Sequence, residues 1–144
     1  MKKLLIANRG EIAIRIGHTA KELGYSTVAV FPEDDVNSLH VKQSDEAVQI
    51  PGAGAQAYLN IEAIINVAKT CGADAVHPGY GFLSENPDFA KACEDADITF
   101  VGPTAAQLSI FGNKAGARAL AAELEIPLVP GTNEDTSLAA IINF

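Results

Sequence analysis

Short apolar runs of β-strand character alternate along this sequence with longer stretches in which apolar residues recur at helical spacing. The runs expected to form strands are residues 3–7, 27–31, 47–50, 73–77 and 98–101. After the first run, Ile12, Ile16 and Ala20 share one helical face. This alternation is typical of parallel strands joined by crossover helices, so it predicts the α/β class, with a parallel sheet flanked by helices.

The pattern changes after Gly102, because residues 104–111 and 113–124 both have helical character with no strand between them. We therefore expect a boundary near residues 102–112. Residues 136–144 are expected to start another helix, whose apolar side chains have no evident packing partner. Two interpretations remain open: the chain is a piece of a longer polypeptide, or it is a small domain with a docked C-terminal helix.

Charge and targeting signals exclude several classes of partner. Ten Lys and Arg residues against 18 Asp and Glu residues give a net charge of −8 and a pI near 4.7, which disfavours nucleic acid and anionic membranes. The apolar run at residues 4–7 is too short for a signal peptide or a membrane span, so we expect a cytoplasmic protein. Cys71 and Cys93 lack metal-ligand spacing and are expected to be free thiols.

Asn8-Arg9-Gly10-Glu11 follows the first strand, where a dinucleotide-binding fold carries a GxGxxG turn. A single glycine stands there, so a nicotinamide-nucleotide site is disfavoured. Arg9 is expected at the carboxyl edge of the sheet, where open α/β sheets bind ligands. Two roles remain open for Arg9: binding an anion, or forming a salt bridge that fixes the turn.

His77-Pro78-Gly79-Tyr80-Gly81 follows the fourth expected strand, again at its carboxyl end. Gly79 and Gly81 allow positive φ and a close backbone approach, so main-chain groups beside the Tyr80 ring are available to a polar planar ligand. A purely structural turn is the alternative. His77 is expected to be a hydrogen-bonded core histidine, because nothing in the sequence pairs it with a nucleophile.

Gly112-Asn113-Lys114 is expected to begin a helix, with Lys114 in its first turn. A cation there opposes the helix dipole, whereas a bound phosphate would reverse that effect. The GxxxxGK[ST] spacing of a P-loop is absent. An exposed, solvated lysine is the alternative interpretation.

Together, in this order and spacing, the three motifs resemble the N-terminal part of the biotin carboxylase component of biotin-dependent carboxylases. The resemblance covers nearly the whole chain and rests on IANRGEIAIRI, YLNIEAII, HPGYGFLSENPDFA, FVGP and the lysine of GNK. It implies a Rossmann-like, pre-ATP-grasp domain at residues 1–110 and the first helices of an ATP-grasp module at residues 111–144. Family members are ligases that use MgATP to activate bicarbonate as carboxyphosphate and then carboxylate biotin.

The resemblance also implies ATP, Mg²⁺ and biotin as cofactors. Implied partners are a biotin carboxyl carrier protein or domain and a carboxyltransferase component, as in carboxylases of acyl-CoA, pyruvate or urea. Lys114 matches the ATP-contacting lysine of the family, and Tyr80 and Gly81 match the turn beside the biotin and bicarbonate site. Asn113 stands where aspartate is usual, and an asparagine keeps the helix-capping role.

A homodimer contact through the first helix is a further implication, with Arg15, His18 and Glu22 at the contact positions. His18 replaces an arginine that is common in bacterial members. The ATP lid, the acidic metal ligands, the bicarbonate-binding arginine and the catalytic glutamate of the family would all lie beyond Phe144. We therefore expect no catalytic residue and no metal ligand here, and no activity from this chain alone. The alternative is a stand-alone Rossmann-like ligand-binding or scaffold module without catalysis.

Overall fold

The computed structural model describes residues 2–130, so the helix expected at residues 136–144 lies outside the described residues. The chain divides into two compact units, Met1–Ala105 and Ala106–Phe144, which are described separately below.

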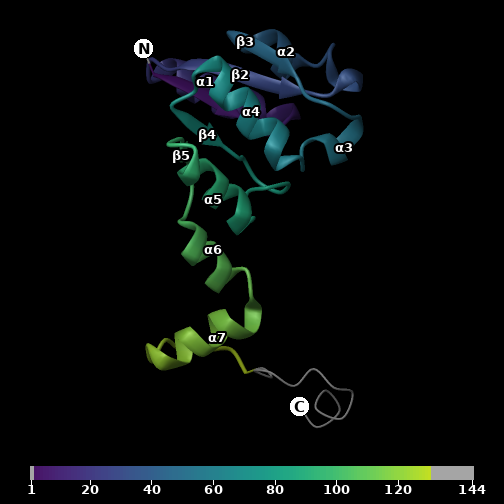
Figure 1. Cartoon of the computed structure of the whole chain (residues 1–144). Coiled ribbons are helices and arrows are strands. Elements are labelled where there is room, and N and C mark those ends of the chain that lie inside the picture. Colours follow the sequence, from purple (N-terminus) through teal and green to yellow (C-terminus); the bar gives the residue numbers. More distant parts are fainter. Residues whose placement is uncertain (1, 131–144) are drawn as a thin grey trace. The chain divides into compact units, whose positions relative to one another are not determined.

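The first unit is built on a five-stranded sheet in which every recorded strand pair is parallel (Figure 1). Its strands are β1 (Lys3–Ile6), β2 (Ser26–Phe31), β3 (Glu46–Gln49), β4 (Ala75–His77) and β5 (Thr99–Phe100). The strands lie in the order β3-β2-β1-β4-β5. The predicted α/β class, with a parallel sheet flanked by helices, is confirmed.

The helices of this unit connect consecutive strands. They are α1 (Gly10–Glu22), a 3-10 turn (Glu33–Asp35), α2 (Leu39–Gln43), α3 (Gly54–Ala57), α4 (Ile61–Cys71) and α5 (Pro87–Asp95). The three longer helices α1, α4 and α5 follow the helical spacing of the sequence. The two short helices, α2 and α3, were not predicted from the sequence. Both are one-turn elements, too short to produce a recognisable apolar period.

The two faces of the sheet carry unequal cores. The larger core packs α4 and α5 against one face, and it includes Leu5, Val28, Val30, Tyr58, Ile64, Val76, Phe89 and Cys93. The smaller core packs α1 against the other face through Leu4, Ile6, Ala13, Ile16 and Ala20. Alternate residues of one strand, such as Leu4 and Leu5, therefore enter different cores, as a pleated strand requires.

Local signals for helix ends agree with the structure. The Asn60 side chain accepts a hydrogen bond from the Ala63 amide at the start of α4, and Asn86 does the same for Phe89 at the start of α5. After α1, Gly24 adopts φ +79° while the Tyr25 amide bonds back to the Ala20 carbonyl, which completes a Schellman turn.

Both cysteines are free thiols, with Cys93 buried and Cys71 half-buried. Within residues 2–130, the structure contains no helix of the length and hydropathy that crossing a bilayer would need.

In the second unit, α6 (Ala105–Phe111) and α7 (Lys114–Glu123) follow each other without a strand between them. Asn113 caps α7, because its side-chain oxygen accepts hydrogen bonds from the amides of Ala115 and Gly116 at 3.0 and 3.1 Å.

Candidate functional site

The strand order creates a topological switch point between β1 and β4. From β1 the chain proceeds to β2 and β3 on one side, then returns to place β4 and β5 on the other side. Loops after two such strands diverge, and the space between them is where open α/β sheets bind ligands. Two glycine-bearing turns end here: residues 8–11 after β1 and residues 78–82 after β4.

The turn after β1 starts helix α1 abruptly. Gly10 has φ +62°, and Arg9 is the N-cap residue without a side-chain capping bond. The side chain of Asn8 is only 3% exposed and turns toward the second loop. Its Nδ2 donates hydrogen bonds to the Pro78 carbonyl at 2.7 Å and the Tyr80 carbonyl at 2.9 Å.

The turn after β4 contains two glycines in the left-handed region, Gly79 at φ +70° and Gly81 at φ +65°. The Gly79 amide donates to Nδ1 of His77 at 3.0 Å, so the neutral His77 ring carries its proton on Nε2. Burial lowers the pKa of His77. The structure therefore agrees with a hydrogen-bonded histidine, here one that supports the turn.

Residues of both turns line a pocket of about 340 Å³. It is lined by Asn8, Arg9, Gly10, Glu11, Ile12, Tyr80, Gly81 and Phe82. The Tyr80 hydroxyl donates to the Glu11 carboxylate at 2.8 Å, and this bond raises the pKa of Tyr80. Because the Tyr80 side chain is 63% exposed, its ring face is accessible to a planar ligand.

Arg9 forms a salt bridge that fixes the turn. Its Nε and one terminal nitrogen donate to the two carboxylate oxygens of Asp35, each at 2.7 Å. Asp35 is buried and also accepts from the Ser38 and Tyr58 hydroxyls, both at 2.9 Å. The hydrogen bonds from Arg9 hold the pKa of Asp35 well below its usual range, despite burial. Because Nε and one terminal nitrogen of Arg9 both donate to Asp35, the structure supports the salt-bridge role of Arg9 rather than the anion-binding one.

His40 lies next to this salt bridge and is 2% exposed. Its Nε2 is 3.4 Å from the Tyr58 hydroxyl, and its Nδ1 has no hydrogen-bond partner in the described structure. Burial lowers the pKa of His40 and raises the pKa of Tyr58. A neutral imidazole is thus favoured beside the ionised Asp35.

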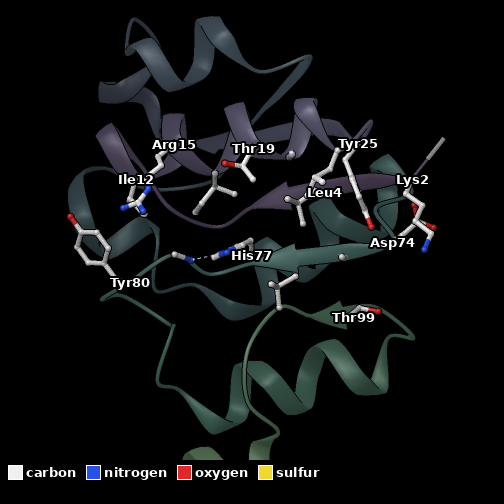
Figure 2. Close-up of a pocket in the computed structure, with 16 residues that line it drawn as sticks. Lys2, Leu4, Ile12, Arg15, Thr19, Tyr25, Asp74, His77, Tyr80 and Thr99 are labelled. Carbon is white, nitrogen blue, oxygen red and sulfur yellow. Dashed lines mark hydrogen bonds between the residues drawn. The ribbon is translucent and has the colours of Figure 1, made fainter.

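A second, larger groove of about 710 Å³ runs along α1 and across the uncovered parts of β4 and β5. Figure 2 shows Tyr80, Ile12 and Arg15 toward one end and Lys2 and Asp74 toward the other. Much of its surface is apolar.

The predicted dimer-contact residues lie on exposed positions of α1. Arg15, His18 and Glu22 are all exposed, and Nδ1 of His18 is 3.6 Å from a carboxylate oxygen of Glu22. These three side chains are thus accessible to solvent on the same helix.

Lys114 is the first residue of α7 and is exposed. It belongs to the second unit, whereas Tyr80 and Gly81 belong to the first. Within residues 2–130, no group of three or more His, Cys, Asp or Glu side chains is arranged to hold a metal ion.

Sequence reasoning missed Asn8, Asp35, Tyr58 and His40. Asn8 had a usable signal, since it is a polar residue directly after a buried strand and before a glycine turn. The other three had none, because their partners are distant in sequence.

Comparison with known proteins gives a consistent result. The family described as "Biotin carboxylase, N-terminal domain" matches residues 1–108. Biotin carboxylase 1 of Bacillus subtilis is 53% identical over 133 residues, which cover 92% of this chain and 30% of the relative. Mitochondrial pyruvate carboxylase of Rattus norvegicus is also 53% identical, with 92% of this chain and 12% of the relative covered. This chain thus spans under a third of either relative.

The solved structures that match this chain are also biotin carboxylase domains. The biotin carboxylase domain of a single-chain bacterial carboxylase has a TM-score of 0.93 and 50% identity, covering 99% of this chain and 34% of that one. The biotin carboxylase domain dimer of Hydrogenobacter thermophilus 2-oxoglutarate carboxylase, in complex with MgADP, ADP and bicarbonate, has a TM-score of 0.91 and 44% identity. It covers 98% of this chain and 32% of that one.

Proposed function

Because the chain belongs to the biotin carboxylase N-terminal domain family, we propose that it forms the N-terminal portion of a biotin carboxylase. The whole protein would be a ligase that uses MgATP and bicarbonate to carboxylate biotin on a carrier protein, for transfer by a carboxyltransferase component. The 53% identity to Bacillus subtilis biotin carboxylase 1 over 92% of the chain carries this proposal. The proposal includes a cytoplasmic location, and this part of it rests only on the short apolar run at residues 4–7.

Residues 1–110 would be the pre-ATP-grasp domain and residues 111–144 the beginning of the ATP-grasp region. Lys114 would contact an ATP phosphate. Its exposed ammonium at the first position of α7 supports this role, since helix N-termini and cations both favour phosphate. The Hydrogenobacter thermophilus structure described with MgADP makes a nucleotide a reasonable ligand for this family.

Tyr80 and Gly81 would lie beside biotin and bicarbonate. The exposed Tyr80 ring and the pocket between the two turns support this placement, because both are at the sheet's switch point. The ligands of Mg²⁺ would lie in parts of the whole protein outside this chain. Arg15, His18 and Glu22 would contribute to a homodimer.

The test is bicarbonate-dependent phosphate release from MgATP, with free biotin as acceptor, in the whole protein that contains this chain. We expect activity there and none from the 144-residue chain. Lys114→Gln should weaken ATP binding about tenfold to a hundredfold, because a charge-assisted contact contributes roughly 1.5–3 kcal/mol. The melting temperature of the Lys114→Gln variant should stay within about a degree or two of that of the wild type.

Lys69→Gln is the matched control, since Lys69 is an exposed lysine of α4 outside the site. It should leave ATP affinity unchanged. A protein that binds ATP or biotin but releases no phosphate would favour the non-catalytic ligand-binding module instead. Equal ATP affinity for wild type and Lys114→Gln would remove Lys114 from the nucleotide site.

A further inference from the structure

Both N–H groups and the oxygen of the Asn8 carboxamide form hydrogen bonds. Its two N–H groups donate to the carbonyls of Pro78 and Tyr80, and its Oδ1 accepts from the Arg9 amide at 2.9 Å. The residue is almost fully buried. One side chain therefore joins the turn after β1 to the turn after β4, 70 and 72 residues away in sequence.

Gly79 packs directly on this carboxamide. A Cβ at Gly79 would lie 2.6 Å from Nδ2 and 2.9 Å from Cγ of Asn8, closer than atoms can approach. The turn can reach Asn8 only because residue 79 has no side chain. The bonds and the packing fix the same backbone conformation.

The bonds of Asn8 also decide which polar groups the turn can offer. Asn8 occupies the carbonyls of Pro78 and Tyr80, and the Ser84 amide occupies the Gly81 carbonyl at 2.9 Å. Among the described residues, the amides of Tyr80 and Gly81 have no recorded partner. The turn is thus left with hydrogen-bond donors for a ligand.

We infer that Asn8 is a positioning residue that holds the Tyr80–Gly81 turn as a donor surface for a ligand oxygen. The ligand class is a hydrogen-bond acceptor, either the ureido carbonyl of biotin or an oxygen of bicarbonate. The identity of that ligand rests on the proposed function, whereas the hold of Asn8 on the turn does not. Asn8 does not take part in bond making or breaking.

The first experiment measures amide hydrogen exchange in the 144-residue chain for wild type, Asn8→Asp and Asn8→Ala. Asn8→Asp preserves shape but replaces the donating group with an oxygen that faces two carbonyls. Asn8→Ala removes the bonds without burying a charge, so it serves if the Asp variant does not fold. Asn60→Ala is the control, because it removes a structural asparagine bond from α4, away from the turn.

Exchange at the Gly79 and Ser84 amides should accelerate at least tenfold more than exchange in β2, which reports global unfolding. In Asn60→Ala, turn and β2 amides should change by the same factor. If either Asn8 variant leaves the turn amides changing in step with β2, Asn8 does not position the turn.

The second experiment measures KM values for biotin, bicarbonate and ATP in the whole protein. An Asn8 variant should raise KM for biotin or for bicarbonate at least tenfold, and whichever rises identifies the acceptor oxygen, while KM for ATP stays within twofold. Unchanged KM values for both, despite accelerated turn exchange, would overturn the role in ligand binding. Absence of wild-type ATP cleavage would instead refute the proposed function, and the exchange data would still decide the positioning role.

Discussion

Replacing Gly79 with alanine tests the packing between the two turns directly. Gly79 has φ +70°, and an added Cβ would meet three atoms of Asn8 at 2.6, 2.9 and 3.1 Å. Gly24 is the matched control, because it has φ +79° and no atom within 4 Å of an added Cβ. The two substitutions share the backbone strain and differ in the contact with Asn8.

The magnitudes separate the two variants. Left-handed backbone costs an alanine about 1–2 kcal/mol, and loss of glycine's freedom in the unfolded chain returns about 0.4–1 kcal/mol. Gly24→Ala should therefore lower the free energy of unfolding by about 1 kcal/mol. Gly79→Ala should add about 1–3 kcal/mol for the overlap, since Asn8 cannot move without giving up its bonds to Pro78 and Tyr80.

Urea unfolding of both variants at pH 7 measures these losses, and a double variant identifies their source. Combining Asn8→Ala with Gly79→Ala should cost less than the sum of the single changes, because Nδ2 and Cγ are gone and only the Cβ contact at 3.1 Å remains. Equal losses for Gly79→Ala and Gly24→Ala, or strict additivity in the double variant, would refute the reasoning.

Three further predictions concern titrating groups. Asp35→Asn should lower the free energy of unfolding by about 1–3 kcal/mol at pH 7. Because the hydrogen bonds from Arg9 lower the pKa of Asp35, the difference from wild type should shrink in urea titrations as pH falls below about 4, and a constant difference would contradict this. Burial lowers the pKa of His77, so the neutral ring, which stabilises the fold, is lost only as the pH falls below about 6.5. NMR should show the ring protonating below that pH, together with a shift of the Gly79 amide signal. Burial raises the pKa of Cys93 to about 11, so a disulfide reagent at pH 8 should label the half-buried Cys71 first, and equal rates would be inconsistent.

The elements that could be predicted from the sequence are those whose signals are local. Buried parallel strands appear as apolar runs, and Asn60 and the Asn86-Pro87 pair mark helix starts through bonds to amides only three residues away. The α3 helix at Gly54–Ala57 could not be predicted in this way, because a single turn rich in glycine and alanine has no apolar face.

The contacts within the site could not be predicted from the sequence, because they join residues that are far apart in the chain. Asp35 belongs to an acidic turn of exposed appearance, and nothing in the sequence indicates that its carboxylate is buried against Arg9, 26 residues earlier. Pairing them requires knowing that β1 lies next to β2, in a register that aligns Ile6 with Ala29. His40 joins the same cluster from α2, in the connection between β2 and β3, and Tyr58 joins it from beyond β3.

The consecutive residues Asn8 and Arg9 show why the switch point concentrates these contacts. β1 lies between β2 and β4 in the sheet, so the turn that follows it has a different neighbour on each side. Asn8 bonds to the turn after β4, and Arg9 bonds to Asp35 after β2. Because the Arg9 amide also donates to Asn8 Oδ1, the two interactions share one peptide unit. Asp35 is therefore connected to the Tyr80–Gly81 turn by a chain of hydrogen bonds through Arg9 and Asn8, which makes the salt bridge part of the site's support.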